Sequence, residues 1–204
     1  MKRVLLIAAL TAPGLAHAAC PVADDLMGGI YVTDDEGSVT LFLADGQDII
    51  ERTQYADSTE GFAYRTALGL LILTYAETED GEPVAGSGET YSYSRDPYGL
   101  TVPENGVWQA RITTTYEDGT DAEFENYTLS AGQRGETTIG ACTYASVPVA
   151  HISLFLSRGE ISAFMQDYLP DLGIAVATGY WDPEAGFERY ENTAISTTPP
   201  ASGQ

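Results

Sequence analysis

The sequence predicts an all-β protein, an antiparallel sandwich or barrel built from hairpins. Acidic residues precede glycine at 36–37, 45–46, 80–81 and 118–119, and strand-forming residues flank each pair. Glycine adopts the positive φ that tight β-turns require, and aspartate tolerates it. The chain also has 13 tyrosines, and aromatic residues are enriched in strands. Regular turn signals between strand-like segments therefore favour a sheet over a helical fold.

The segment 107–116 shows the clearest strand pattern. Its alternate positions place five side chains on one face, namely Trp108, Ala110, Ile112, Thr114 and Tyr116. Such alternation is typical of a half-buried antiparallel strand. By similar reasoning we expect strands over residues 30–33, 39–43, 49–55, 62–67, 70–76, 90–95, 123–130, 137–144, 149–156, 174–180 and 187–195.

The segment 157–169 fits two kinds of element. Its apolar residues between Ile161 and Leu169 recur at helical spacing. Gly159 near its start and Pro170 at its end disfavour a helix. We therefore expect a strand here.

Residues 1–18 are predicted to be a cleavable signal peptide. Basic residues precede a short apolar run, and Ala16 and Ala18 are small residues at the cleavage site. Lipid attachment at Cys20 is the alternative, but His17 stands where such signals have a leucine-like residue. The run is also shorter than the roughly 20 residues of a membrane-spanning helix. We expect a protein of the periplasm or the exterior, soluble after cleavage and without integral membrane insertion.

The rest of the chain is expected to form a single β-rich domain over residues 19–195, followed by a disordered tail over 196–204. It also shows an apparent internal duplication, with halves at 20–95 and 142–195 and a hairpin insert between them. Both halves begin at a cysteine and contain a Leu-Phe-Leu triplet before a glycine turn, then a Leu-Gly pair. Convergent strand and turn chemistry is the alternative to a true duplication.

The charge of the chain excludes some classes of partner and of chemistry. It has 30 acidic residues and 9 basic ones, a net charge of −21, and its only lysine is Lys2. This charge repels nucleic acid and anionic lipid, so we expect no nucleic-acid partner. The lack of lysine after the signal peptide excludes phosphate-binding loops and Schiff-base chemistry.

The two cysteines, Cys20 and Cys142, are predicted to form a disulfide. An exported chain with an even number of cysteines normally oxidises them. A catalytic thiol needs a basic neighbour that lowers its pKa, and the mature chain has no lysine and one histidine to provide it.

No catalytic or metal-binding motif is present. The chain has no Gly-x-Ser-x-Gly elbow, and its histidine after residue 18, His151, is expected to be a hydrogen-bonded or surface side chain. Acidic loops at 34–36, 77–82 and 117–123 offer oxygen ligands for calcium, but their spacing differs from that of an EF-hand. The sequence therefore assigns no catalytic residue, no metal ligand and no cofactor.

Three functional hypotheses remain. The first is a non-enzymatic exported β-domain that binds a small ligand, a glycan or another envelope protein. Its weak candidate binding residues are the aromatic side chains of Trp108, Tyr180 and Trp181, for which core packing is the alternative. The second is a hydrolase that cleaves an extracellular polymer with paired carboxylates. The third is a calcium-stabilised structural module.

Overall fold

The chain folds as one antiparallel sheet. A computed structural model describes residues 19–102, 104–183 and 185–200, so the predicted signal peptide lies outside the described residues. The described part contains two short 3-10 helices and no α-helix, which confirms the predicted all-β class. The helices are η1 (Ala23–Met27) and η2 (Pro97–Gly99). The strands are β1 (Ile30–Asp34), β2 (Val39–Asp45), β3 (Asp48–Gln54), β4 (Glu60–Ala67), β5 (Leu71–Glu79), β6 (Glu82–Pro83), β7 (Glu89–Tyr93), β8 (Val107–Tyr116), β9 (Glu123–Ala131), β10 (Gly135–Ile139), β11 (Cys142–Phe155), β12 (Glu160–Leu169), β13 (Ile174–Asp182), β14 (Gly186–Arg189) and β15 (Asn192–Ser196).

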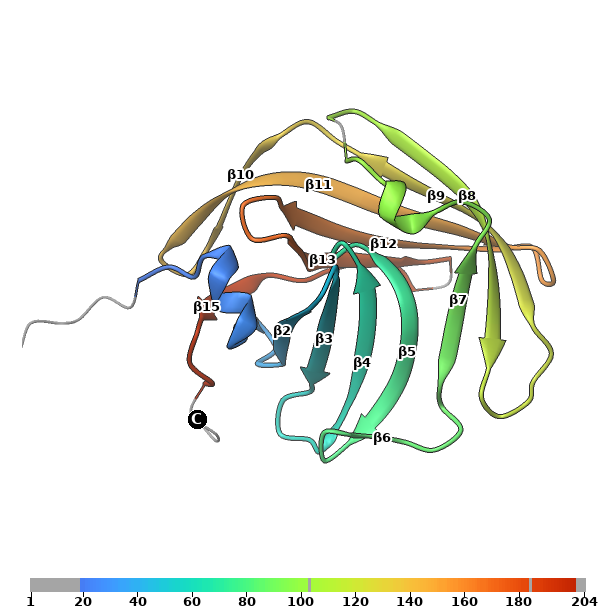
Figure 1. The fold of residues 1–204 in the computed structure, drawn as a ribbon, viewed down its shortest axis with the longest axis horizontal. Coiled ribbons are helices and arrows are strands. Elements are labelled where there is room, and N and C mark those ends of the chain that lie inside the picture. Colours follow the sequence, from blue (N-terminus) through green and yellow to red (C-terminus); the bar gives the residue numbers. More distant parts are fainter. Residues whose placement is uncertain (1–18, 103, 184, 201–204) are drawn as a thin grey trace, which may run out of the picture.

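The strands follow the order β14-β13-β12-β11-β9-β8-β7-β5-β4-β3-β2-β1-β15, with β6 and β10 attached at the sides. Figure 1 shows how this sheet bends over on itself. Strands β8, β9 and β11 to β13 arch over strands β2 to β5, and β7 joins the two layers on the right. The two layers face each other across the core, as in a β-sandwich.

The two edge strands of the sheet, β14 and β15, follow each other in the chain. The short connection between them brings the two edges together. Strand β14 pairs with β13, and β15 pairs with β1 at the opposite end of the order. The backbone ladder is not closed into a barrel. Instead, the Asn192 side chain donates a hydrogen bond of 2.8 Å to the carbonyl of Ala177 in β13. The Tyr190 amide also donates to the carbonyl of Thr178. These contacts hold the two edges beside each other around an enclosed interior.

The turn signals of the sequence are confirmed. Gly37, Gly46, Gly81 and Gly119 all have positive φ and lie in the turns between successive strands. Two strand predictions need correction. The predicted strand 137–144 is a hairpin, because Gly140 takes a positive φ of 59° between β10 and β11. The predicted strand 187–195 divides into β14 and β15, which pair with different strands.

The segment whose apolar residues recur at helical spacing forms strand β12. Phe164 on this strand faces the interior, whereas Ile161 is 45% exposed on the outer surface. Both faces of the strand therefore carry apolar side chains, which hides the usual alternation of apolar and polar residues. The prediction of a strand here is confirmed.

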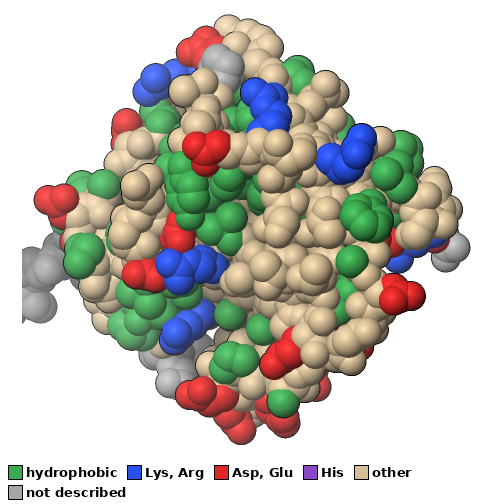
Figure 2. Space-filling model, turned by 45° about the vertical axis from the view of Figure 1, so that its right-hand side comes forward, with side chains coloured by type: hydrophobic (Ala, Val, Ile, Leu, Met, Phe, Trp, Pro, Cys, Tyr) green, Lys and Arg blue, Asp and Glu red, His purple; other side chains and the backbone are tan. Residues whose placement is uncertain are grey.

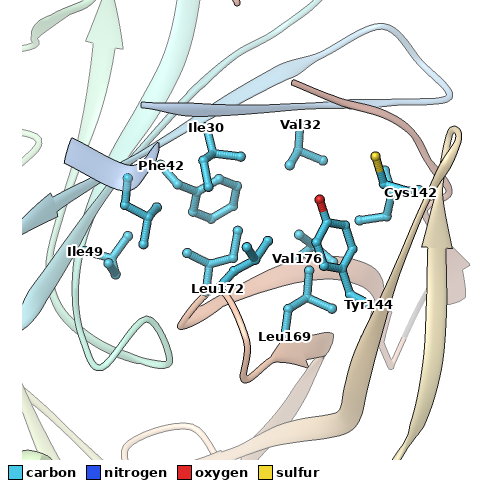
Figure 3. Close-up of a cluster of buried hydrophobic side chains, with 12 residues drawn as sticks. Ile30, Val32, Phe42, Ile49, Cys142, Tyr144, Leu169, Leu172 and Val176 are labelled. Carbon is cyan, nitrogen blue, oxygen red and sulfur yellow. The ribbon is translucent and has the colours of Figure 1, made fainter. Parts of the chain in front are cut away.

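Two clusters of buried apolar side chains connect the layers. The first joins η1 and β1 to β3 with β10 to β13, and Figure 3 shows Ile30 and Phe42 facing Leu172 and Val176. The second joins β4 and β5 with β8, β9 and β11 and includes Trp108. Full burial of one such side chain contributes about 1.5 to 3 kcal/mol, so these clusters hold the two layers together.

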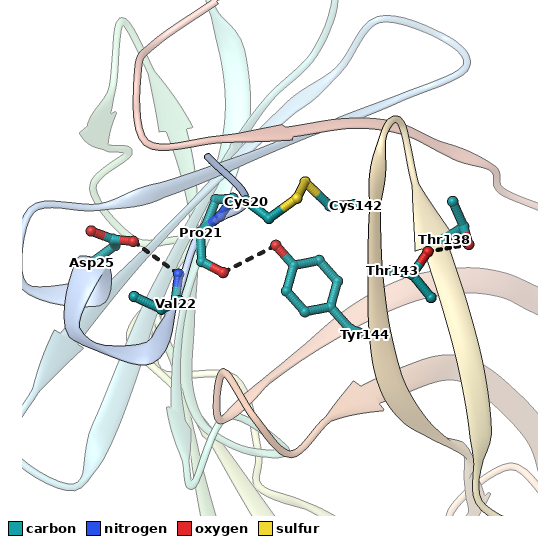
Figure 4. Close-up of a disulfide and its surroundings, with 8 residues drawn as sticks. All are labelled: Cys20, Pro21, Val22, Asp25, Thr138, Cys142, Thr143 and Tyr144. Carbon is teal, nitrogen blue, oxygen red and sulfur yellow. Dashed lines mark hydrogen bonds between the residues drawn. A yellow bond between two sulfur atoms is a disulfide. The ribbon is translucent and has the colours of Figure 1, made fainter. Parts of the chain in front are cut away.

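The structure contains the predicted disulfide between Cys20 and Cys142, with a Cα separation of 5.5 Å. It ties the first described residues to the start of β11 (Figure 4). Beside it, the Tyr144 hydroxyl donates a hydrogen bond of 3.1 Å to the carbonyl of Pro21. The N-terminal segment is therefore fixed over the first core cluster, which includes Cys142 and Tyr144.

Two hairpin turns contact each other between the layers. Leu68 and Gly69, with φ of 56° and 67°, form the turn between β4 and β5. A Cβ added to Gly69 would lie 2.3 Å from the carbonyl oxygen of Gly173, in the turn between β12 and β13. These turns carry the two Leu-Gly pairs of the apparent duplication, which stays a prediction.

The close contact at Gly69 predicts a position-specific loss of stability. Gly69→Ala and Gly46→Ala both place alanine at a φ near 67°, but an added Cβ at Gly46 meets no atom within 4 Å. We expect Gly46→Ala to lower the free energy of unfolding by about 1 kcal/mol and Gly69→Ala by at least about 2 kcal/mol. Urea unfolding measures both values. Equal losses would contradict the contact between the turns.

The disulfide predicts a second effect on stability. It closes a loop with a sequence separation of 122 residues, and restriction of the unfolded chain contributes roughly 4 to 5 kcal/mol in the loop-entropy description. We expect a reductant to lower the urea midpoint markedly. The control is the Cys20→Ala/Cys142→Ala protein, whose midpoint should not respond to reductant. An unchanged midpoint in the unmodified protein would contradict the prediction.

Candidate interior binding site

The interior of the bent sheet contains a cavity of about 590 Å³. It lies between the two core clusters, since Phe42 and Val176 of the first and Ile112 and Tyr127 of the second all line it. Its volume falls within the range of about 300 to 1,000 Å³ that is usual for small-molecule sites. Because the strands alternate, every second side chain of β4, β8, β9, β11 and β12 points into it.

Aromatic rings form much of the cavity wall. Phe62 and Tyr64 on β4 have ring centroids 5.0 Å apart in an edge-on arrangement. Tyr93 on β7 and Tyr127 on β9 lie opposite Trp108 and contact each other at 6.0 Å. The hydroxyl groups of these tyrosines make the wall amphipathic, so it suits a ligand with an apolar body and polar groups.

Six acidic side chains line the described cavity, among them the three glutamates Glu51, Glu89 and Glu125. Glu51 is 7% exposed, and its Oε1 accepts a hydrogen bond of 3.1 Å from the Thr66 hydroxyl. Glu125 is 4% exposed and lies within 3.4 Å of the Thr114 hydroxyl. Glu89 accepts a hydrogen bond from the Tyr91 hydroxyl. Among the described residues, none of the three glutamates takes part in a salt bridge.

Burial controls the charge of two of these groups. It raises the pKa of Glu51 from 4.5 to about 8, against a smaller lowering by the Thr66 hydroxyl. Burial likewise raises the pKa of Glu125, while hydrogen bonds from Ser153 and Thr114 lower it. Removing a carboxylate from water without a counter-charge favours its neutral form. At neutral pH the Glu51 carboxyl therefore carries a proton and serves as a hydrogen-bond donor as well as an acceptor.

His151 on β11 is a neutral, half-buried imidazole at the same cavity. Its Nδ1 lies 2.5 Å from the Tyr127 hydroxyl. Its Nε2 is buried and has no hydrogen-bond partner of ordinary geometry among the described residues, although Gln166 lies close enough to influence its pKa. Burial lowers the pKa of His151 from 6.5 to about 4. A buried polar atom without a partner costs stability, which makes Nε2 available to a ligand.

A charged cluster lies at another part of the wall. Glu123 accepts hydrogen bonds from Tyr116 and Ser157, and Arg158 lies 3.6 Å from it. Arg158 also pairs with Glu160 at 2.8 Å. Among the described residues that line the cavity, Arg158 is the one arginine. It already forms ion pairs with two carboxylates.

A second cavity of about 640 Å³ adjoins the first between β5 and β7. These strands pair at only two positions, Thr74 with Thr90 and Tyr75 with Glu89. Tyr64, Glu89 and Tyr116 line both cavities. The short pairing therefore leaves an approach to the interior beside Tyr64 and Glu89.

The structure separates the aromatic residues that the sequence suggested for binding. Trp108 is 8% exposed in the second core cluster, where it packs on Tyr93 and Tyr127. Tyr180 lines the cavity, whereas the next residue, Trp181, pairs with Ala163. Alternation along β13 places Tyr180 and Trp181 on opposite faces, so these three residues do not form one site.

The main residues of the cavity, Glu51, Tyr64 and His151, were not identified as a site from the sequence. Their partners lie on other strands and are distant in the chain, as with Tyr127 and His151. One feature of the sequence could have indicated that Glu51 faces the interior. Glu51 lies in the predicted strand 49–55 at the position expected for an inward-facing residue, because Ile49 two residues earlier is buried.

The acidic loops considered for calcium have local roles in the described chain. Asp34 accepts hydrogen bonds from the amides of Glu36 and Ser38, and Asp118 accepts one from the Thr120 amide. No group of three or more His, Cys, Asp or Glu side chains in the described ranges is arranged to hold a metal ion. No helix described here is long and apolar enough to cross a membrane.

The raised pKa of Glu51 predicts a pH-dependent stability. Below pH 4.5 the Glu51 carboxyl is protonated in both the folded and the unfolded state, so its ionisation does not lower the free energy of unfolding. Between 4.5 and 8 the unfolded state releases its proton first, and the free energy of unfolding falls by about 1.4 kcal/mol per pH unit. We expect Glu51→Gln to remove this slope, as measured by urea unfolding across that pH range. Parallel pH profiles for the two proteins would contradict the assignment.

Comparison with known proteins assigns no family to this chain. No family model matches it, and no curated protein matches it significantly. Among solved structures it is similar to the hypothetical lipoprotein YmcC from Escherichia coli K12, at 10% identity and a TM-score of 0.46. The similarity covers 81% of this chain and 87% of that chain. This similarity assigns no function to the chain.

Proposed function

We propose that this protein is a non-enzymatic binding protein of the cell envelope or exterior that holds a small organic molecule inside its bent sheet. The observation that carries the proposal is the cavity of about 590 Å³, whose wall combines aromatic rings with buried glutamates and with the buried Nε2 of His151, which has no hydrogen-bond partner among the described residues. The predicted signal peptide and the acidic composition support an exported location.

The composition of the wall supports binding over a purely structural role. A sheet that only needed a core would be more stable with aliphatic side chains in this space, because close packing removes voids. Here the interior instead carries Glu51, Glu125 and His151, each of which costs free energy to bury. Such groups, converging on one cavity together with shifted pKa values, are typical of functional sites.

The position of the site inside the bent sheet favours a small molecule over a polymer. Tyr64, Tyr91, Tyr93 and Tyr127 line the inside of the sheet rather than a flat outer platform. A glycan chain or a protein segment would need an open groove, whereas a compact molecule fits within the volume available.

The proposal predicts saturable binding of a neutral apolar probe. N-phenyl-1-naphthylamine, which fluoresces in apolar surroundings, should show a saturable increase in fluorescence with the wild-type protein. The Ser162→Trp variant should lose this increase, because Ser162 lines the cavity and the indole would occupy it.

The matched control is Ile161→Trp. Ile161 is the preceding residue of the same strand and is 45% exposed on the outer surface, so this variant should bind the probe like the wild type. Circular dichroism confirms that both variants keep their strand content. Equal binding by the two variants, or no saturable binding by the wild type, would overturn the proposal.

A further inference from the structure

The charges of the cavity wall are strongly biased toward carboxyl groups. Glu51, Glu89 and Glu125 line the cavity without a salt-bridge partner among the described residues. Arg158 is held by Glu123 and Glu160. An anionic ligand would therefore meet repulsion from the three glutamates as they ionise and find no free cation.

Glu51 is one of the two largely buried glutamates of the wall. It lies on β3 with its neighbours in the ladder, Phe42 and Tyr64, on either side. The Thr66 hydroxyl donates a hydrogen bond of 3.1 Å to its Oε1. The side chain is only 7% exposed, and it lines the cavity.

Tyr64, the ladder neighbour of Glu51 on β4, belongs to a cluster of aromatic rings. Tyr64 lies beside Phe62 at 5.0 Å and beside Tyr75 at 5.2 Å between ring centroids, and Tyr55 adds a further contact to Phe62 at 5.9 Å. The faces of such rings attract cations, and the attraction is stronger when water is excluded. A carboxyl group beside several tyrosine rings is a combination that suits an ammonium group on an apolar body.

We propose that the cavity takes an organic cation, a molecule with a protonated amine on an apolar or aromatic body, and that Glu51 is its counter-ion. This inference rests on the proposed function of the cavity and specifies the ligand class. The ammonium group would donate hydrogen bonds to Glu51 and lie against Tyr64. The net charge of −21 would favour the approach of such a ligand, and Figure 2 shows acidic side chains gathered along the lower edge of one face.

Binding of a cation then requires Glu51 to lose its proton. Burial holds the pKa of this carboxyl near 8, so at neutral pH the proton leaves as the ammonium enters. One proton is released for each cation bound. The affinity for the cation should therefore rise by about tenfold per pH unit below pH 8 and level off above it. A neutral ligand of the same shape should show no such rise.

The test compares two probes that differ in charge alone. Monodansylcadaverine carries a primary ammonium group, and N-acetyl-monodansylcadaverine has the same fluorophore and chain without the charge. Fluorescence titrations at about pH 6 and about pH 8, in about 0.15 M salt to screen the exposed charges, give the affinities. We expect the wild-type protein to prefer the amine by at least about tenfold at pH 8, with a smaller preference at pH 6.

Two variants test whether the preference for the amine probe depends on Glu51. Glu51→Gln should reduce the affinity for the amine to that for the acetylated probe and remove the pH dependence. Glu136→Gln makes the same substitution at an exposed position on β10, and it should leave the preference for the amine and its pH dependence unchanged. Circular dichroism and the affinity for the acetylated probe show whether Glu51→Gln is folded.

Each other outcome contradicts a different claim. Equal affinity of the wild type for both probes would overturn the cation inference and leave the binding function standing. A preference for the amine that survives in Glu51→Gln would overturn the role of Glu51. Failure of both dansyl probes and of N-phenyl-1-naphthylamine to bind would overturn the binding function and this inference together.

Discussion

A single antiparallel sheet has two faces and two edges, and this chain must shield one face and both edges from unwanted contact. It does so by bending until β13 and β15 lie beside each other. The contact depends on the segment 190–192, where the Tyr190 amide and the Asn192 side chain both donate to carbonyls of β13. Because the edges meet there, the inner face is enclosed, and both core clusters and the cavity follow from that arrangement.

The interior combines ordinary packing with polar groups that are costly to bury. Ile30, Leu71 and Leu169 are fully buried in the apolar clusters and stabilise the fold in the usual way. Glu51 and His151 lie between those clusters and act in the opposite direction. Burial raises the pKa of the first and lowers the pKa of the second, so both groups are driven to their neutral forms. Neutral forms keep hydrogen-bonding capacity without the full cost of a buried charge.

The sequence predicts the local features of this fold well. Positive-φ glycines such as Gly46 mark the turns, and the alternation of 107–116 identifies which side chains of β8 face inward. Such features depend on neighbouring residues and are visible in the chain itself. The pairing of β15 with β1 is different, because those strands lie at opposite ends of the domain. Nothing in the spacing of 187–195 indicates that the chain crosses between the two edges at that point.

The cavity was difficult to predict for a related physical reason. Alternation along the predicted strand 149–156 correctly separates His151 from Ile152 and Leu156, but it does not show which set of side chains faces inward. Ile152 and Leu156 are apolar and resemble a core face, yet they are 38% and 49% exposed. The inner face of β11 is the one with His151, because its neighbours across the sheet are Tyr127 of β9 and Phe164 of β12.

That reversal connects the fold to the proposed function. Burial of Ile152 and Leu156 in place of His151 would gain apolar contact and remove an unpartnered polar atom. The chain instead keeps the imidazole, Glu51 and the tyrosine hydroxyls inside, against the arrangement that stability alone favours. Departures of this kind, in which local preference and packing disagree, are concentrated at functional sites. A ligand that pairs with these groups offsets part of the free energy that their burial costs, and for Glu51 the matching partner is a positive charge.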